Sequence, residues 1–222
     1  ITQDLCFIQY KDEKIDLAIP VESHTEKKIK TIDKSARLYR DFPLVGTENF
    51  YFPFILNGLN FFPTDKRDSV LLTDTASNSV LVNREIFIHA INKSKVFVEW
   101  LKNNNGKNLS LLAQSRIPST LNEPEVIRWY RENIQKPYRF FLIEQEIVET
   151  ASDKIKVKEA IIPKFSGTKE QNEKFWEILN SYFGGDRVCR KDYLSSWQEN
   201  IGPESEIETW GQKVFYKIED LL

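Results

Sequence analysis

The order of apolar and polar residues predicts strands early in the chain. LCFIQY (5–10) and KIDLAIPVE (14–22) have the alternation of half-buried strands and flank a short polar turn, which together predict a β-hairpin. The later stretch 41–62 is too rich in Phe and Pro for a helix and too apolar for a surface loop. We expect buried strands there, with Asn57-Gly58 supplying the positive φ of a tight turn or bulge.

A long amphipathic helix is predicted next, over residues 79–102. Its apolar residues recur at spacings of three, four and seven, which places one broad stripe along the helix. Ser77, Asn78 or Ser79 can cap its start, and NNNG (103–106) ends it with residues that tolerate the left-handed conformation. The stripe consists of Val82, Ile86, Phe87, Ala90, Ile91, Phe97, Val98 and Leu101.

Strand and helix patterns then alternate to the last residue. They predict helix 123–136, strands 138–150 and 154–163, and helices 168–185, 190–201 and 205–222. Thr168 and Gln171 have the spacing of a capping box at the start of one of these helices. The interleaving predicts an α+β fold in which a mixed β-sheet packs with helices. We expect a strand-rich subdomain over residues 1–115, which holds the long helix, and a smaller α/β subdomain over 116–222 that ends in helices.

Composition and charge narrow the range of partners. Of 222 residues, 41% are hydrophobic, and the 31 Lys and Arg nearly balance the 33 Asp and Glu. That balance gives no support for binding to nucleic acid or to an anionic membrane. The two cysteines, Cys6 and Cys189, lie far apart and indicate reduced thiols. Because no apolar run approaches the roughly 18 residues of a membrane span and the start lacks a signal peptide, we expect a cytoplasmic protein.

Most motifs of catalysis and cofactor binding are absent from the sequence. None of the eight glycines forms a Gly-x-Gly or Walker-type phosphate loop. His24 and His89 are the only histidines, and neither has metal-ligating residues at a usual spacing. A small hydrolase would need a nucleophile motif such as Gly-x-Ser-x-Gly, which does not occur. We therefore expect no enzyme activity, cofactor site or metal site within this chain alone.

One basic residue is well placed between predicted elements. Arg67 in TDKRDS follows the expected buried strands and immediately precedes the long helix. A guanidinium in such a place can contact a phosphate or a carboxylate on a neighbour, because its fork of donors matches both. The alternative is an ordinary surface turn in which Arg67 pairs with Asp65 or Asp68, and the residues alone favour that turn.

Three consecutive stretches resemble a known protein family. FPLVGTENFYFPFILNG (42–58), FFPTDKRDSVLL (61–72) and NREIFIHAINKSKVFVEWL (83–101) are similar, in this order, to the segment that follows the ATP-binding domain in sacsin-like proteins. These are relatives of the ninety-kilodalton heat-shock chaperones within the GHKL superfamily of ATPases. The resemblance is clearest over residues 41–101, and it extends loosely to IQKPYRFFLIEQEIVET and EAIIP.

The resemblance implies that this chain transmits the nucleotide state of an ATPase domain, and that ATP is bound and hydrolysed outside this chain. ATP and Mg²⁺ would bind in an ATPase domain upstream of Ile1, and the absence of any Met agrees with a segment of a longer protein. The middle, or transducer, segment of such proteins resembles a ribosomal-protein-type β-α-β fold and supplies a basic residue to the γ-phosphate. Arg67 matches that position best and Lys66 is the second choice. Leu71 departs from the chaperones, which tend to have a polar Gln there.

Two functions follow as expectations. In the first, the chain couples the nucleotide state of its own upstream ATPase domain to conformational change, with protein clients and a homo-oligomer as further possible partners. In the second, the chain is a self-contained protein-interaction module with no link to ATP. The Phe-rich strands and the Trp-bearing helices would then form a docking face, and Arg67 would be a surface ion-pair partner.

Overall fold

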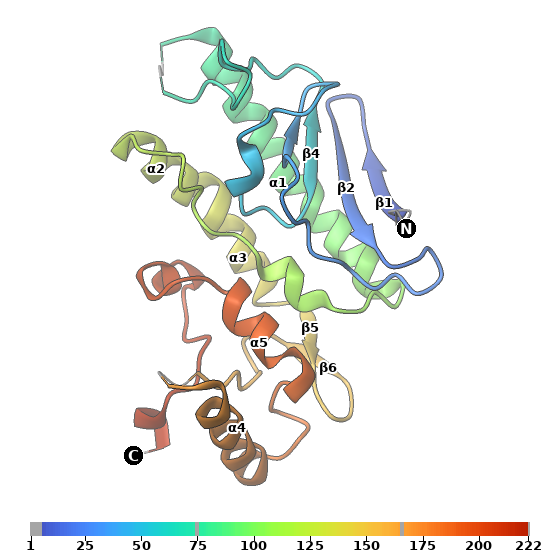
Figure 1. Cartoon of the computed structure of the whole chain (residues 1–222), viewed down its shortest axis with the longest axis vertical. Helices are drawn as coiled ribbons and strands as arrows, with labels where there is room; N and C mark the ends of the chain where they lie inside the picture. Colours follow the sequence, from blue (N-terminus) through green and yellow to red (C-terminus); the bar gives the residue numbers. More distant parts are fainter. Residues whose placement is uncertain (1–5, 74–75, 165–166, 222) are drawn as a thin grey trace.

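The computed structural model describes residues 6–73, 76–164 and 167–221, and it has an α+β fold (Figure 1). A mixed four-stranded sheet and one long helix lie at one end of the molecule, and helix α4 (Lys169–Phe183) lies at the other. Helix α3 and strands β5 and β6 lie between these ends, and α2 lies at the level of the sheet (Figure 1). Their bounds are α2, Pro124–Tyr130; α3, Lys136–Leu142; β5, Glu146–Glu149; and β6, Lys154–Lys156.

The predicted hairpin forms and becomes half of the larger sheet. Strands β1 (Cys6–Lys11) and β2 (Ile15–Val21) pair antiparallel, β4 (Ile55–Gly58) pairs antiparallel with β2, and the short β3 (Leu38–Tyr39) runs parallel to β4. The alternation of β2 buries every second side chain, because successive residues of a strand point to opposite faces of the sheet. One face of the sheet is therefore apolar and needs a cover.

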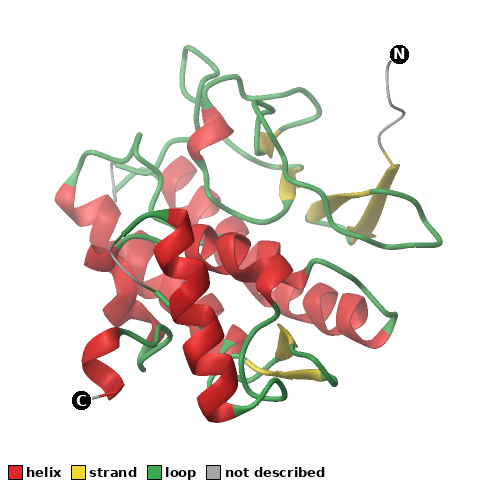
Figure 2. Ribbon diagram, turned by 60° about the horizontal axis from the view of Figure 1, so that its bottom comes forward, coloured by secondary structure: helices red, strands yellow, loops and turns green. Residues whose placement is uncertain are grey.

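Helix α1 (Asn78–Asn103) provides that cover and confirms the predicted long helix. Its predicted apolar stripe is buried except for Val82, which is half-buried. Asn105 follows the end of the helix with a left-handed φ of 59°, as the NNNG sequence predicts. Figure 2 shows the helices packed together on one side of the four-stranded sheet. Ser77 is the N-cap residue, without a side-chain hydrogen bond.

Stretch 41–62 differs from its prediction. Only Ile55–Gly58 is a strand, and the rest is irregular backbone whose phenylalanines are nevertheless buried. Asn57 and Gly58 form no turn: they pair with Asp16 and Ile15 of β2, and neither has a positive φ. Glycine is needed at 58 for space, because a Cβ there would lie 2.4 Å from the ring of Phe61.

The predicted helix 123–136 is longer than its pattern indicates. It continues through a π-helical turn, Arg131–Gln135, into α3, so residues 138–142 are helical where a strand was predicted. Pro137 has no N–H for the carbonyl four residues back, and the wide turn directly precedes it. Strand β5 therefore begins only at Glu146, and it pairs with β6 across the predicted polar turn.

Two of the three predicted C-terminal α-helices form. Helix α4 (Lys169–Phe183) begins with the predicted capping box of Thr168 and Gln171, and α5 (Lys191–Asn200) follows. The prediction of a helix over 205–222 was wrong. The chain forms a 3₁₀-helix, Glu204–Trp210, and then turns at Gly211, whose φ of 71° ends the helical conformation.

Most buried apolar side chains belong to one cluster that runs from Ile15 to Phe215. It draws on residues both before and after position 115, and the boundary between two subdomains at 115/116 stays a prediction. Within the described ranges, no helix combines the length and the apolar character that crossing a bilayer requires.

Candidate functional site

The loop of residues 62–72, here called the Arg67 loop, has a defined conformation. The hydroxyl of Thr64 donates to the Asp68 carboxylate at 2.7 Å, and the N–H of Arg67 donates to the Thr64 carbonyl at 2.9 Å. Pro63 and Val70 form a β-bridge at the base of the loop. Arg67 itself has a left-handed φ of 55°, the backbone conformation that the sequence predicts for Asn57-Gly58 and that neither of those residues adopts.

A buried asparagine holds the Arg67 loop against the start of α1. The Asn83 amide accepts from the N–H of Phe62 at 2.8 Å and donates to the carbonyls of Phe62, at 2.9 Å, and Leu71, at 2.8 Å. The next residue, Arg84, donates to the carbonyl of Leu72 and lies over the Trp129 ring. Both sides of the loop are therefore fixed to one turn of α1.

The two predicted site residues, Arg67 and Lys66, are exposed at the tip of this loop. The Arg67 guanidinium lies over the ring of Phe42, 5.2 Å from its centroid. In the described part of the chain neither Arg67 nor Lys66 forms an ion pair, and the Asp68 carboxylate accepts from Thr64 instead. The donors of Arg67 are thus accessible from outside the molecule.

Three exposed apolar side chains lie on the Arg67 loop or beside its backbone. Phe62 is 39% exposed, Leu71 is 36% exposed, and the two are joined by a backbone hydrogen bond. Val45 is 67% exposed and precedes Gly46, where a Cβ would lie 2.8 Å from the carbonyl oxygen of Asp68. Val45, Phe62 and Leu71, together called the apolar rim, leave nonpolar surface in water on the same part of the molecule as the Arg67 loop.

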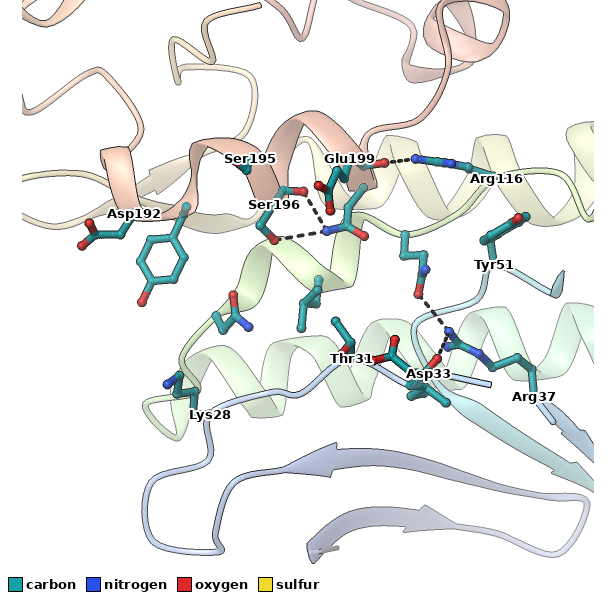
Figure 3. Close-up of a pocket in the computed structure, with 16 residues that line it drawn as sticks. Lys28, Thr31, Asp33, Arg37, Tyr51, Arg116, Asp192, Ser195, Ser196 and Glu199 are labelled. Carbon is teal, nitrogen blue, oxygen red and sulfur yellow. Dashed lines mark hydrogen bonds between the residues drawn. The ribbon is translucent and has the colours of Figure 1, made fainter. Parts of the chain in front are cut away.

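Sequence reasoning missed a groove of about 880 Å³ elsewhere in the molecule (Figure 3). It lies between segment 28–37, the stretch around the 3₁₀-helix Leu109–Ala113, and helix α5. Figure 3 shows Arg37, Tyr51 and Arg116 at one end of the groove and Lys28 at the other. No local sequence pattern predicts this groove, because its walls come from segments that are far apart in the sequence.

The groove contains a buried arginine. Arg37 is 4% exposed and donates to the carbonyls of Phe52 and Ile32, each at 2.9 Å, and to the Gln114 side chain at 3.4 Å. Burial lowers the pKa of Arg37 to about 10, against the opposing effect of the nearby Asp33 charge. Among the described residues, no carboxylate forms an ion pair with it.

A second buried arginine holds the C-terminal segment to α3. All five N–H groups of Arg139 are used: they donate to the Ser115 hydroxyl and carbonyl, to the Glu206 carbonyl and carboxylate, and to the Thr209 hydroxyl. The guanidinium also lies 4.9 Å from the Trp210 ring centroid. Gln135, in the π-helical turn, donates to the same Glu206 carboxylate at 2.6 Å.

The remaining polar candidates have structural surroundings. The Nε2 atom of His89 lies 2.8 Å from the Asp12 carboxylate. No group of three or more metal-ligating side chains occurs within the described residues. Cys6 and Cys189 are free thiols, and burial, aided by the Glu149 charge, raises the pKa of Cys189 to about 12.

No protein-family model, curated protein or solved structure matches this chain. The resemblance to sacsin-like proteins therefore depends on the residues that carry it, in the stretches 42–58, 61–72 and 83–101. It stays a prediction, and the geometry of the Arg67 loop is what a functional proposal can build on.

Proposed function

We propose that the chain is the middle, transducing segment of a sacsin-like, chaperone-type ATP-binding protein. Arg67 contacts the γ-phosphate held by an upstream ATPase domain when that domain closes onto this segment. The chain itself performs no catalysis and holds neither ATP nor Mg²⁺. Its role is to make domain closure depend on the nucleotide.

The observation that carries this proposal is an exposed cation on a fixed loop. Arg67 has accessible donors and no ion-pair partner among the described residues, while Thr64 and Asp68 define the turn and Asn83 fixes it to α1. A preformed donor of this kind loses little conformational freedom when an anion arrives. The apolar rim can be buried by the same contact.

The connection between the Arg67 loop and α1 would transmit a movement of Arg67 to the helix. This helix has 26 residues and is therefore roughly 39 Å long. Since Asn83 and Arg84 join the loop to the first turns of α1, a displacement of Arg67 toward a phosphate displaces the start of the helix as well. Arg67 has its phosphate partner only in the closed state, so nucleotide binding favours that state.

The test is ATP turnover by the longer protein that the proposal requires. Arg67→Ala should lower turnover at saturating ATP at least about tenfold, because a cation that neutralises a transferring phosphoryl group acts in the transition state. ATP should bind more weakly but still measurably, since the same cation contacts the γ-phosphate in the closed state. Lys66→Ala should have a much smaller effect. The matched control is Arg187→Ala, because Arg187 is also exposed and lies over a phenylalanine ring, that of Phe183.

Two results would overturn the proposal. One is unchanged turnover in Arg67→Ala, and the other is a longer sequence without an Asp-x-Gly-x-Gly block before Ile1. Either result favours the interaction module, in which Arg67 and the apolar rim form an ordinary protein-docking face.

A further inference from the structure

The Arg37 end of the groove holds a buried cation whose partners are all neutral. Two of its partners are backbone carbonyls, those of Phe52 and Ile32. The third is the side-chain oxygen of Gln114, at the long distance of 3.4 Å, and the Nε atom of Arg37 has no acceptor. Burying a charge without a counter-ion is unfavourable, which is why buried arginines usually have a carboxylate beside them, as Arg139 has.

A second arginine at this end is also without an ion pair in the described part of the chain. Arg116 donates to the backbone carbonyl of Glu199, and its guanidinium lies 5.6 Å from the Tyr51 ring centroid. Tyr51 lies between the two arginines (Figure 3). This end of the groove thus combines two guanidinium groups, a phenol ring and the amide of Gln114.

The acidic residues that line the groove leave these cations available. Asp33 is exposed and accepts a hydrogen bond from Thr31, and its charge acts on Arg37 although the two form no ion pair. Asp192 pairs with Arg190 outside the groove lining. Glu199 contacts Arg116 through its backbone oxygen. The groove is large enough for a metabolite-sized ligand, since such pockets measure roughly 300–1,000 Å³.

We infer that the groove binds a ligand through a phosphate or carboxylate group that lies beside Arg37 and Arg116, whether or not the chain belongs to an ATPase. The anion displaces the weakly held amide of Gln114 and accepts from the guanidinium of Arg37. A planar guanidinium donates two parallel hydrogen bonds to either kind of oxyanion, so the two share one recognition chemistry. Helix α5 and segment 28–37 form opposite walls, and the rest of the ligand lies between them.

Inorganic phosphate and acetate, titrated separately at constant ionic strength against sodium chloride, are the first probes. The NMR resonances of the arginine Nε–H groups report binding. The Arg37 resonance is assigned as the one that is missing from the spectrum of Arg37→Lys. We expect the Arg37 signal to shift with a dissociation constant on the order of 1–10 mM, typical of a single anionic group. A response to phosphate alone identifies a phosphate ligand, and a response to acetate alone identifies a carboxylate. If neither anion shifts the Arg37 signal more than chloride does, the inference is wrong.

A nearly isosteric substitution separates a built anion site from general charge attraction. Gln114→Glu places a carboxylate where the amide oxygen now accepts from Arg37, so it should raise the unfolding temperature and weaken phosphate binding at least tenfold. The matched control is Gln9→Glu, which adds the same charge at an exposed position of β1 outside the groove lining. It should leave both quantities unchanged. Equal phosphate affinity in the unmodified protein and in Gln114→Glu would contradict the inference, and so would equal losses in both variants.

Discussion

Arg139 and Arg67 are arginines in opposite surroundings. Arg139 is fully buried, pairs with Glu206 at 3.2 Å, and has an acceptor for each of its five N–H groups. Arg67 is exposed on a loop and lies over the ring of Phe42. Burial lowers the pKa of Arg139 to about 10, although the Glu206 carboxylate acts in the opposite direction.

The difference separates residues that hold the fold from residues that can meet a partner. Because every donor of Arg139 is used inside the molecule, its removal should affect stability and little else. The donors of Arg67 are accessible, so its removal should affect binding and leave stability almost unchanged. Arg37 lies between these cases: it is nearly as buried as Arg139, but all its hydrogen-bond partners are neutral.

The largest effect is expected at the buried pair. Arg139→Met should destabilise the protein by about 3–5 kcal/mol, because Glu206 is left buried without its cation. Urea unfolding measures this change. The double variant Arg139→Met/Glu206→Met should recover part of the loss, since both charges are then absent. A double variant that is less stable than Arg139→Met would show that the ion pair is not the cause.

The next effect concerns the attachment of the Arg67 loop. Asn83→Ala should cost about 2–3 kcal/mol, because it leaves the backbone groups of Phe62 and Leu71 without their buried partner. Amide hydrogen exchange should become faster at Phe62. Asn92→Ala, at an exposed position of the same helix, is the control and should change neither quantity. Similar results for the two variants would mean that the loop is held by something else.

A smaller, pH-dependent effect is expected at Asp12, in the turn between β1 and β2. Burial acts to raise the pKa of Asp12, but the N–H groups of Lys14 and Ile15 and the His89 ring outweigh it, and the pKa falls to about 2. Because the folded pKa lies below the unfolded value, Asp12 stabilises the protein above about pH 4, and this contribution is lost as the pH falls toward 2.

Asp12→Asn tests this directly. It should destabilise the protein at pH 6 by about 1–2 kcal/mol and remove part of the acid sensitivity between pH 4 and pH 2. Unfolding by urea at several pH values provides the measurement, with Glu13→Gln as the control at the neighbouring exposed position. An unchanged acid profile in Asp12→Asn would assign the sensitivity to other groups.

The smallest stability effect is expected at Arg67. Arg67→Ala should change the free energy of unfolding by no more than about 0.5 kcal/mol, because an exposed side chain over one ring contributes little. Thermal unfolding beside Lys66→Ala provides the comparison. A loss above about 1.5 kcal/mol would mean that Arg67 supports the fold, and the contrast with Arg139 would fail.

Elements with strong local signals could be predicted from the sequence. The first hairpin, helix α1 and the capping box of α4 each depend on neighbours within a few residues. The sequence predicts a strand over residues 138–142, where the structure has a helix, because their aromatic content favours both states. Their helical spacing, which buries Tyr138 and Leu142 on one side of α3, became decisive only in the packed molecule.

The candidate site residues also differ in whether the sequence could predict them. Arg67 could be selected from the order of nearby elements and from the resemblance of stretch 61–72 to sacsin-like proteins. Asn83 could not, since its partners Phe62 and Leu71 are known only once the loop packs on α1. The groove depends on contacts among segments 28–37, 108–116 and 192–200, which are separated by about 70 residues or more, and one sequence carries no local signal for such contacts.

The most direct test of the central claim compares the affinities of ATP and ADP for the longer protein, with and without Arg67→Ala. A contact between Arg67 and the γ-phosphate favours ATP alone, because ADP lacks that group. The substitution should therefore weaken ATP binding by about tenfold or more and leave ADP binding unchanged, as expected for the loss of a charge-assisted hydrogen bond. If both affinities stay unchanged, or fall equally, Arg67 does not contact the γ-phosphate.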